Sequence, residues 1–190
     1  MDSQTLIQTD EELKSFLEEV KLGRTQQELD LIAKAALFSK KAHQGMTRLS
    51  GEPFFTHPLS VTHLLIPLGA DTTTICAALL HDVIEDCQIS PQKLKDDFGE
   101  EITTIIQSLS KIKDLPAQSI KQEKASQNIR KILLASSKDI RVLLIKLADR
   151  LHNMQTLKFL PEEKQKKISK ETLEVYAQKP SKLFSEKSNS

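Results

Sequence analysis

The sequence predicts an all-α fold, a single bundle of about eight to ten helices. Leu, Ile, Ala, Lys and Glu dominate the composition, and the 190 residues include only five Gly and seven Pro, a balance that favours helix. Most segments place apolar residues at helical spacing between capping and stop signals. The chain has no internal repeat, no alternation of strand and helix patterns and no Gly-rich phosphate loop.

The first half of the chain divides into helices with clear boundary signals. Thr25 and Glu28 form a capping box that opens the amphipathic stretch LDLIAKAALFSKKAH. The segment QGMTRLSGEPFF follows, and its Gly and Pro content without a regular period predicts a loop. His57 and Pro58 begin the next helix, which Pro67 ends.

The second half continues the same pattern. Asp71 can cap a helix that contains the stretch LLHDVIED. Further helices are expected over residues 91–98, 100–112, 123–136, 140–157 and 161–177. Because no segment has the composition of an interdomain linker, we expect a helical extension over residues 1–24, one domain over 25–178 and a polar tail over 179–190.

Composition limits the function classes. The net charge of +1 gives no general attraction to nucleic acid or to a membrane surface. No run approaches the roughly 18 apolar residues of a membrane span, and the acidic start MDSQTLIQTDEELK does not resemble a signal peptide. Cys76 and Cys87 form no C-x-x-C pair, and Cys76 lies in an apolar run, so a reduced, cytoplasmic protein is expected.

The stretch LLHDVIED places four ionisable groups directly after the apolar run ICAALL. At about 100° per residue, Glu85, Asp82 and Asp86 lie about 40°, 100° and 140° from His81 on a helix. All four therefore share one side, which we expect to face a cleft. Crowded carboxylates repel one another, a divalent cation offsets the repulsion, and His with Asp suits manganese, iron or zinc. A solvated acidic helix end is the alternative.

Two further positions favour a metal site. His57 stands at a helix start just after the irregular loop, where capping or packing is the alternative role. Asp149 is embedded in the apolar run IKLADRLHNM, and a buried carboxylate requires a partner. That partner is either a metal ion or a cation among Lys146, Arg150 and Arg141. Two imidazoles and two carboxylates from three helices can converge on one ion in a helical bundle.

Glu85 and Asp86 lie one turn beyond the candidate ligands and are not needed to hold the ion. A carboxylate in that place can position an attacking water and take its proton. On the helix that carries Asp149, the residues Asn153, His152 and Thr156 lie with it within about 100° of one another. The expected chemistry is metal-assisted hydrolysis, with phosphate esters as the natural substrates.

These residues resemble the pattern H…HD…D of the HD phosphohydrolase superfamily. The segments AHQGMTRLSGEPFFTHP, AALLHDVIED, FGEEI, QNIRKILLA and DIRVLLIKLADRLHNMQTL more specifically resemble the hydrolase domain of the RelA/SpoT family, over residues 29–177. The resemblance implies hydrolysis of guanosine tetra- and pentaphosphate, (p)ppGpp, in which pyrophosphate leaves the ribose 3′ position and GDP or GTP remains. Since the chain turns to QKPSKLFSEKSNS after ETLEVYA, we expect a stand-alone small alarmone hydrolase or an isolated hydrolase fragment.

Carried over residue by residue, the resemblance assigns a role to each candidate. The implied ligands of Mn²⁺, with Fe²⁺ or Zn²⁺ as alternatives, are His57, His81, Asp82 and Asp149. Glu85 and Asp86 match the acidic pair that activates the water. The residues matching the nucleotide site are Arg48, which stacks on guanine, Ser50 in the same loop, and Asn153 and Thr156 in the pocket. The implied partner is a guanine nucleotide, and oligomeric state does not follow.

The sequence departs from the family pattern at one position near the candidate nucleotide site, and three alternative functions remain open. Family members usually carry Lys where this chain has Leu49, which puts base preference or affinity in question. A hydrolase of another nucleotide, such as the 2′-phosphate of NADPH, is therefore an alternative. An inactive nucleotide-sensing module is a second alternative, although no ligand is lost. Nucleic-acid binding is the weakest, because glutamates dilute the lysines between residues 158 and 170.

Overall fold

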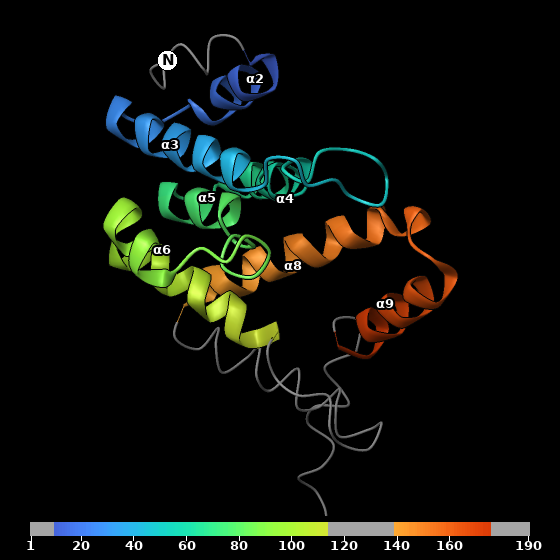
Figure 1. Ribbon diagram of the computed structural model, residues 1–190. Helices are drawn as coiled ribbons and strands as arrows, with labels where there is room; N and C mark the ends of the chain where they lie inside the picture. Colours follow the sequence, from blue (N-terminus) through green and yellow to red (C-terminus); the bar gives the residue numbers. More distant parts are fainter. Residues whose placement is uncertain (1–9, 114–138, 176–190) are drawn as a thin grey trace, which may run out of the picture.

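The computed structural model describes residues 10–113 and 139–175, and it is all-α over these residues, as predicted (Figure 1). The described part contains no strand beyond the isolated bridge between Thr47 and Pro53. Its α-helices are α2 (Glu11–Val20), α3 (Gln26–Ala42), α4 (Thr56–Leu65), α5 (Thr72–Leu79), α6 (Pro91–Lys113), α8 (Ile140–Gln155) and α9 (Glu162–Val175). Short 3-10 turns, η1 (Ile66–Leu68) and η2 (Leu157–Phe159), follow α4 and α8. The helix expected over 123–136 and the tail over 179–190 lie outside the described residues.

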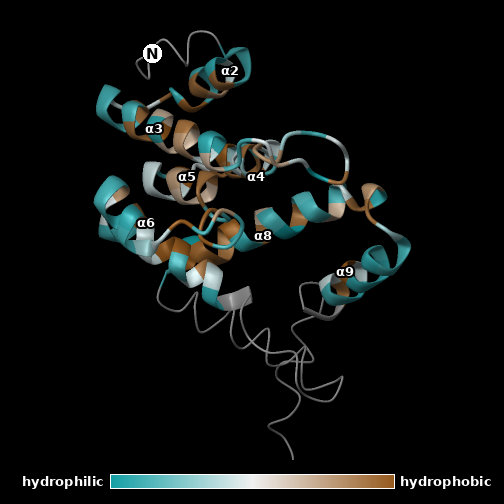
Figure 2. Cartoon of the chain, in the orientation of Figure 1, coloured by the Kyte–Doolittle hydropathy of each residue, from teal (hydrophilic) through white to brown (hydrophobic). Residues whose placement is uncertain are grey.

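Helix α5 is the centre of the bundle. It packs against α3, α4, α6 and α8, and it lies between α3 and α6 in Figure 1. Every residue from Thr74 to Leu79 is buried, because ICAAL presents apolar side chains on all sides. Figure 2 shows hydrophobic residues gathered where α4, α5 and α6 meet, whereas α9 and the outer ends of α3 and α6 are hydrophilic.

The boundary signals in the sequence work as predicted. Thr25 and Glu28 form the reciprocal capping box of α3, and the Asp71 side chain accepts a hydrogen bond of 2.7 Å from the Thr74 backbone N–H at the start of α5. Gly69 ends the turn after α4 in the left-handed region at φ 72°. Gly99, at φ 84°, breaks α6 into the two helical segments expected on either side of it.

The N-terminal extension packs into the same core as the rest of the bundle. Leu13, Phe16 and Val20 of α2 are buried within that core. The guanidinium of Arg24 then donates to the carbonyl oxygens of Val20 and Ala70, at 2.5 and 2.6 Å. Arg24 therefore provides a hydrogen-bond donor for a backbone carbonyl at the end of α2 and links that end to the connection between α4 and α5.

Helix α5 ends at Leu79, so the expectation that LLHDVIED continues the helix is wrong. Residues 80–86 form successive turns, in which the Val83 N–H bonds the Leu80 carbonyl. One physical reason is that the last-turn carbonyl of Ala78 bonds Nδ1 of the His81 ring at 2.8 Å. The helical angles calculated for His81 to Asp86 therefore do not apply, although the motif still follows a fully buried helix.

A charge cluster around Arg141 joins the beginnings of three segments. Its guanidinium lies 2.7 Å from Glu101 on α6, 2.7 Å from Asp139 before α8 and 3.4 Å from Asp71 before α5. The paired carboxylates raise the pKa of Arg141 further above its ordinary value, with the Asp139 hydrogen bond as the largest cause. These contacts place the start of α8 beside the start of α5.

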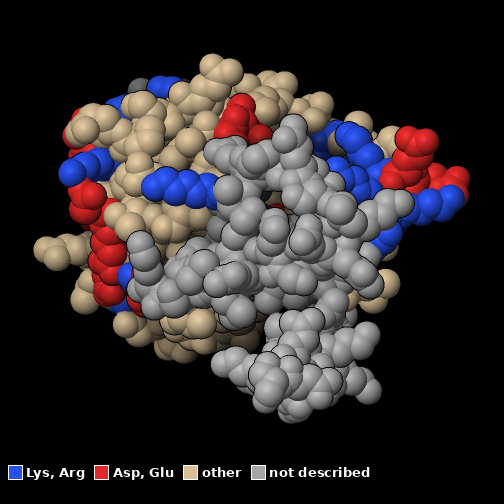
Figure 3. Space-filling view, turned by 90° about the horizontal axis from the view of Figure 1, so that it is seen from below, with Lys and Arg blue, Asp and Glu red and all other residues tan. Residues whose placement is uncertain are grey.

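Charges on the described surface are mixed in sign. On the face drawn in Figure 3, basic and acidic side chains lie next to one another at the margins. On α9, for example, Lys166 pairs with Glu162 at 2.6 Å. Cys76 is a buried core residue, as expected. Among the helices of the described ranges, none combines the length and apolarity that crossing a bilayer requires.

Candidate active site

Three separate segments bring the predicted ligands together. His57 comes from the first turn of α4, His81 and Asp82 from the turns after α5, and Asp149 from α8. Nε2 of His57 lies 3.3 Å from Oδ2 of Asp82 and 3.4 Å from Oδ1 of Asp149, and Nε2 of His81 lies 2.9 Å from Oδ2 of Asp82. All four side chains are buried, so the cluster is an interior site and not a solvated helix end.

The orientation of His81 suits metal binding. Its Nδ1 bonds the Ala78 carbonyl oxygen, which can only accept, so the ring carries its proton on Nδ1. Nε2 is thus the ring atom that faces the cluster and can offer a lone pair to a bound cation. One ligand atom each from His57, His81 and Asp149 lie within 4.8 Å of one another, a spacing compatible with a single ion, and Asp82 contacts both imidazoles.

Both carboxylate oxygens of Asp149 are engaged by neighbours on its own helix. Lys146 Nζ lies 2.8 Å from Oδ2, and the Asn153 amide donates to Oδ1 at 2.6 Å. Of the three cations considered from the sequence, Lys146 is thus a direct partner. Burial alone would raise the pKa of Asp149, but Lys146, the hydrogen bond from His57 and the nearby His81 hold it well below its ordinary value. The carboxylate is therefore ionised and preformed for a cation.

His152 was not assigned a role from the sequence, yet it contacts a candidate ligand. Its Nδ1 lies 2.8 Å from Nδ1 of His57, and both rings are buried. Burial, followed by the neighbouring His57 and Arg48, lowers the pKa of His152 to about 4, so its ring is neutral. The feature of the sequence that could have pointed to His152 is its spacing of three residues from Asp149, which places both side chains on adjoining faces of α8.

The loop before α4 is shaped around Phe54. The Arg48 N–H bonds the Glu52 carbonyl, and the Phe54 N–H bonds the Met46 carbonyl, both at 2.9 Å. The Phe54 ring stacks on His43 with centroids 5.0 Å apart, its centroid is 5.8 Å from Cζ of Arg48, and it meets His57 edge-on at 6.4 Å. One aromatic ring therefore supports both a candidate metal ligand and the candidate base-stacking arginine.

A cavity of about 490 Å³ opens beside the cluster. Its lining includes Arg48 and Leu49 from the loop, Asn153 from α8, and three of the four candidate ligands. Leu49 is 64% exposed at this cavity. The cavity therefore joins a buried acidic and imidazole cluster to an arginine that can stack on a planar group.

The other four predicted site residues are not among the residues that line the cavity. Glu85 is half-buried and Asp86 is exposed, both on the turns after α5. The Ser50 hydroxyl donates to Glu52 at 2.9 Å, and the Thr156 hydroxyl donates to the His152 carbonyl at 3.0 Å. Burial, together with the nearby carboxylate of Asp86, raises the pKa of the Cys87 thiol to about 11.

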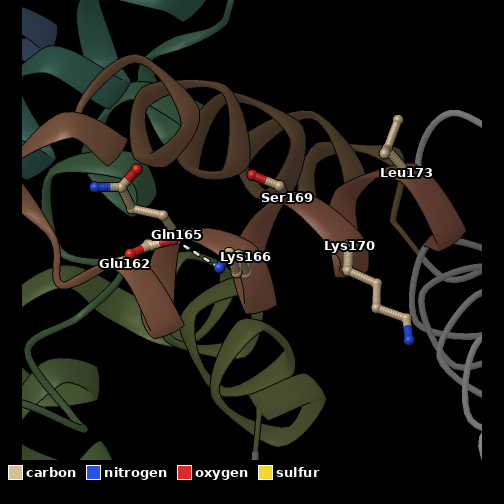
Figure 4. A pocket seen from close by; sticks show the side chains of 6 residues that line it. All are labelled: Glu162, Gln165, Lys166, Ser169, Lys170 and Leu173. Atoms are coloured by element: carbon tan, nitrogen blue, oxygen red, sulfur yellow. Dashed lines mark ion pairs between the residues drawn. The ribbon is translucent and has the colours of Figure 1, made fainter.

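A second cavity, of about 640 Å³, is lined by a single face of α9 (Figure 4). Its lining side chains are Glu162, Gln165, Lys166, Ser169, Lys170 and Leu173. They include no residue of the acidic and imidazole cluster and no predicted site residue. The smaller cavity beside His57 is therefore the candidate active site.

Residues 35–181 match the HD domain family. The chain belongs to the HD domain family. A divalent metal is characteristic of this domain. The buried His57, His81 and Asp149 fit such an ion by donor type and spacing, and Asp82 contacts both imidazoles. The expected resemblance to the RelA/SpoT hydrolase domain is confirmed by the relatives that follow.

Several curated proteins resemble this HD domain closely. It is 46% identical over 140 residues to a guanosine-3′,5′-bis(diphosphate) 3′-pyrophosphohydrolase of Haemophilus influenzae, covering 74% of this chain and 20% of that protein. It is 44% identical over 152 residues to a GTP pyrophosphokinase of Myxococcus xanthus, covering 79% of this chain and 20% of that protein. The chain thus spans about a fifth of the length of the curated relatives it matches.

A solved structure shares the fold of this HD domain. It is a metazoan orthologue of SpoT described as hydrolysing ppGpp, and it superimposes with a TM-score of 0.62 at 23% identity. The match covers 76% of this chain and 83% of that one. At this identity the likeness concerns the arrangement of the helices.

Proposed function

We propose that this HD domain hydrolyses (p)ppGpp in a metal-dependent reaction. Water attacks at the phosphorus bonded to the ribose 3′ oxygen, that P–O bond breaks, and GDP or GTP leaves together with pyrophosphate. One observation carries the proposal: a cavity lined by Arg48 opens beside the cluster of His57, His81, Asp82 and Asp149. The 46% identity to the Haemophilus influenzae pyrophosphohydrolase supports this substrate class over other phosphate esters.

The proposed ligands are His57, His81, Asp82 and Asp149, with manganese as the ion and iron or zinc as alternatives. When bound, a divalent cation supplies Lewis-acid stabilisation of charge on the reacting phosphate and lowers the pKa of water. Lys146 and Asn153 hold the Asp149 carboxylate in place from either side. The cluster is buried, so these electrostatic interactions act with little screening by water.

Glu85 and Asp86 are the proposed acceptors of the proton that leaves the attacking water. Their place on the turns directly after His81 and Asp82 supports that role, because the chain holds both pairs on one short run of turns. Arg48 is proposed to stack on the guanine base, and Asn153 to face the nucleotide from α8. Ser50 is proposed to adjust the conformation of the loop, and Thr156 that of the end of α8, the two segments that border this pocket.

The deciding experiment measures pyrophosphate release from guanosine tetraphosphate by the purified chain, with and without added Mn²⁺. We expect release only with the metal. The exposed Leu49 favours one second candidate, removal of the 2′-phosphate of NADPH, since the loop lacks a cation at that position. Release of inorganic phosphate from NADPH, without pyrophosphate from the alarmone, would replace the first proposal by the second.

A further inference from the structure

The contact between His57 and His152 places constraints on both rings. Their Nδ1 atoms lie 2.8 Å apart, the ring centroids are 4.9 Å apart, and both side chains are buried. At that distance one Nδ1 donates a proton and the other accepts it, because two N–H groups facing each other would repel. The direction of this hydrogen bond decides which nitrogen of each ring carries a hydrogen.

The opposite edge of His57 fixes that direction. Its Nε2 lies 3.3 Å from Asp82 and 3.4 Å from Asp149, so Nε2 is the atom that faces the proposed ion. A metal ligand nitrogen must present a lone pair, and a neutral imidazole has only one N–H. When the ion is bound, the one hydrogen of His57 is therefore on Nδ1, which leaves His152 as the acceptor at its own Nδ1 and with its hydrogen on Nε2.

We infer that His152 is a positioning residue of the metal centre: its Nδ1 accepts the Nδ1 hydrogen of His57 and so holds the Nε2 lone pair of His57 toward the cation. This rests on the proposed function, since it takes His57 as a ligand. Metal-ligating histidines commonly donate their other N–H to a partner that fixes ring orientation. Ala78 provides such a partner for His81 through a backbone carbonyl, whereas His57 relies on a side chain.

The position of His152 in the fold suits this role. It lies on α8, one turn beyond Asp149, and its own carbonyl accepts the Thr156 N–H at the end of the helix. The same helix thus presents a ligand, Asp149, and the group that orients a ligand from another helix, His57. Substitution of His152 should therefore weaken metal binding without removing any ligand atom.

A matched pair of variants separates this role from simple packing. Asn and Leu have nearly the same shape, but only Asn places an acceptor oxygen where Nδ1 of His152 stands. Titration of the substrate-free chain with MnCl₂, followed by the electron paramagnetic resonance signal of unbound Mn²⁺, gives the dissociation constant. We expect His152→Leu to bind Mn²⁺ about 10- to 100-fold more weakly and His152→Asn to stay within about threefold of the unsubstituted chain. His63→Leu, on α4 beside Glu19, is the unchanged control.

Equal weakening in the Asn and Leu variants, or none in either, would overturn the inference. A second measurement needs no variant: ¹⁵N chemical shifts of the histidine rings in the chain titrated with Zn²⁺. We expect a hydrogen on Nδ1 of His57 and on Nε2 of His152, and a hydrogen on Nδ1 of His152 refutes the role. Failure of the unsubstituted chain to bind metal or to release pyrophosphate would instead count against the proposed function.

Discussion

The ammonium group of Lys146 lies 2.8 Å from Oδ2 of Asp149, and both side chains are buried. Both charges are largely withdrawn from bulk water, so each depends on the other for compensation. Asn153 adds a hydrogen bond to the second oxygen of the same carboxylate. The Asp149 carboxylate is thus fixed in orientation before any cation arrives. This lowers the free-energy cost of reorganising the carboxylate when a cation binds.

Replacing Lys146 by Met should therefore destabilise the protein. The substitution retains the apolar stem but leaves a buried carboxylate without its ammonium partner, which costs about 3 to 5 kcal/mol. Urea unfolding of the metal-free protein measures the change. Lys166→Met is the matched control, because its pair with Glu162 is exposed and should contribute less than about 1 kcal/mol. Similar losses in both variants would contradict this account of the buried pair.

Asp82→Ala and Glu85→Ala should both abolish hydrolysis, but for different reasons. Loss of Asp82 removes a proposed ligand that contacts both imidazoles, so Mn²⁺ affinity and activity should fall together. Loss of Glu85 removes a proposed proton acceptor, so kcat should fall at least about 100-fold while Mn²⁺ affinity stays near that of the unsubstituted chain. Pyrophosphate release and metal titration on the same preparations distinguish the two. Full activity in either variant would refute the role of that residue.

Leu49→Lys should strengthen binding of the polyanionic nucleotide. The side chain is exposed at the cavity, where an added ammonium can approach phosphate, and one solvated charge pair lowers KM about fivefold. The gain should shrink as salt is added. Leu22→Lys carries the same charge change in the turn after α2, at a position that is 92% exposed and does not line the cavity, and it should leave KM unchanged. An equal fall in KM for both variants would indicate a general charge effect.

His43 should make stability depend on pH. Burial lowers its pKa below the ordinary value, so the folded state favours the neutral ring and the unfolded state binds the proton more readily. The contribution of the neutral His43 ring to the free energy of unfolding is therefore complete above a pH of about 6.5 and is lost as the pH falls below that value. His43→Asn removes the titration but can still donate to the Ser39 carbonyl that Nδ1 now contacts at 2.8 Å. We expect a flatter curve of unfolding free energy against pH for the variant, and identical slopes would contradict the assignment.

Local signals account for most of what could be predicted. The capping box at Thr25, the cap at Asp71 and the break at Gly99 act through neighbouring backbone groups, so the sequence around each is sufficient to locate a helix boundary. The candidate ligands were recognisable because His81 follows an apolar run, Asp149 is embedded in one, and His57 begins a helix after an irregular loop. Their convergence required the packing of α4 and α8 on α5, which no local period contains.

The remaining features depend on tertiary contacts. The end of α5 at Leu79 involves the His81 ring bonding the Ala78 carbonyl, and a period of about 3.6 residues gives no sign of it. His152 shares a helix face with Asp149, but its contact is with His57, 95 positions earlier in the chain. Only the folded arrangement distinguishes such a residue from an ordinary buried histidine.

The ion pair between Arg141 and Asp71 has a consequence for the spacing of the proposed ligands. It joins α8 and α5 at their beginnings, while Asp149 and His81 lie farther along the two segments, with about 12 Å of helix between Arg141 and Asp149. Helix α8 is also held along its length by its packing on α4 and α6. Sliding α8 past α5 by a fraction of a turn would change the gap between the ligand atoms. The Arg141 contacts, at the surface end of the bundle, therefore contribute to the geometry of the interior end.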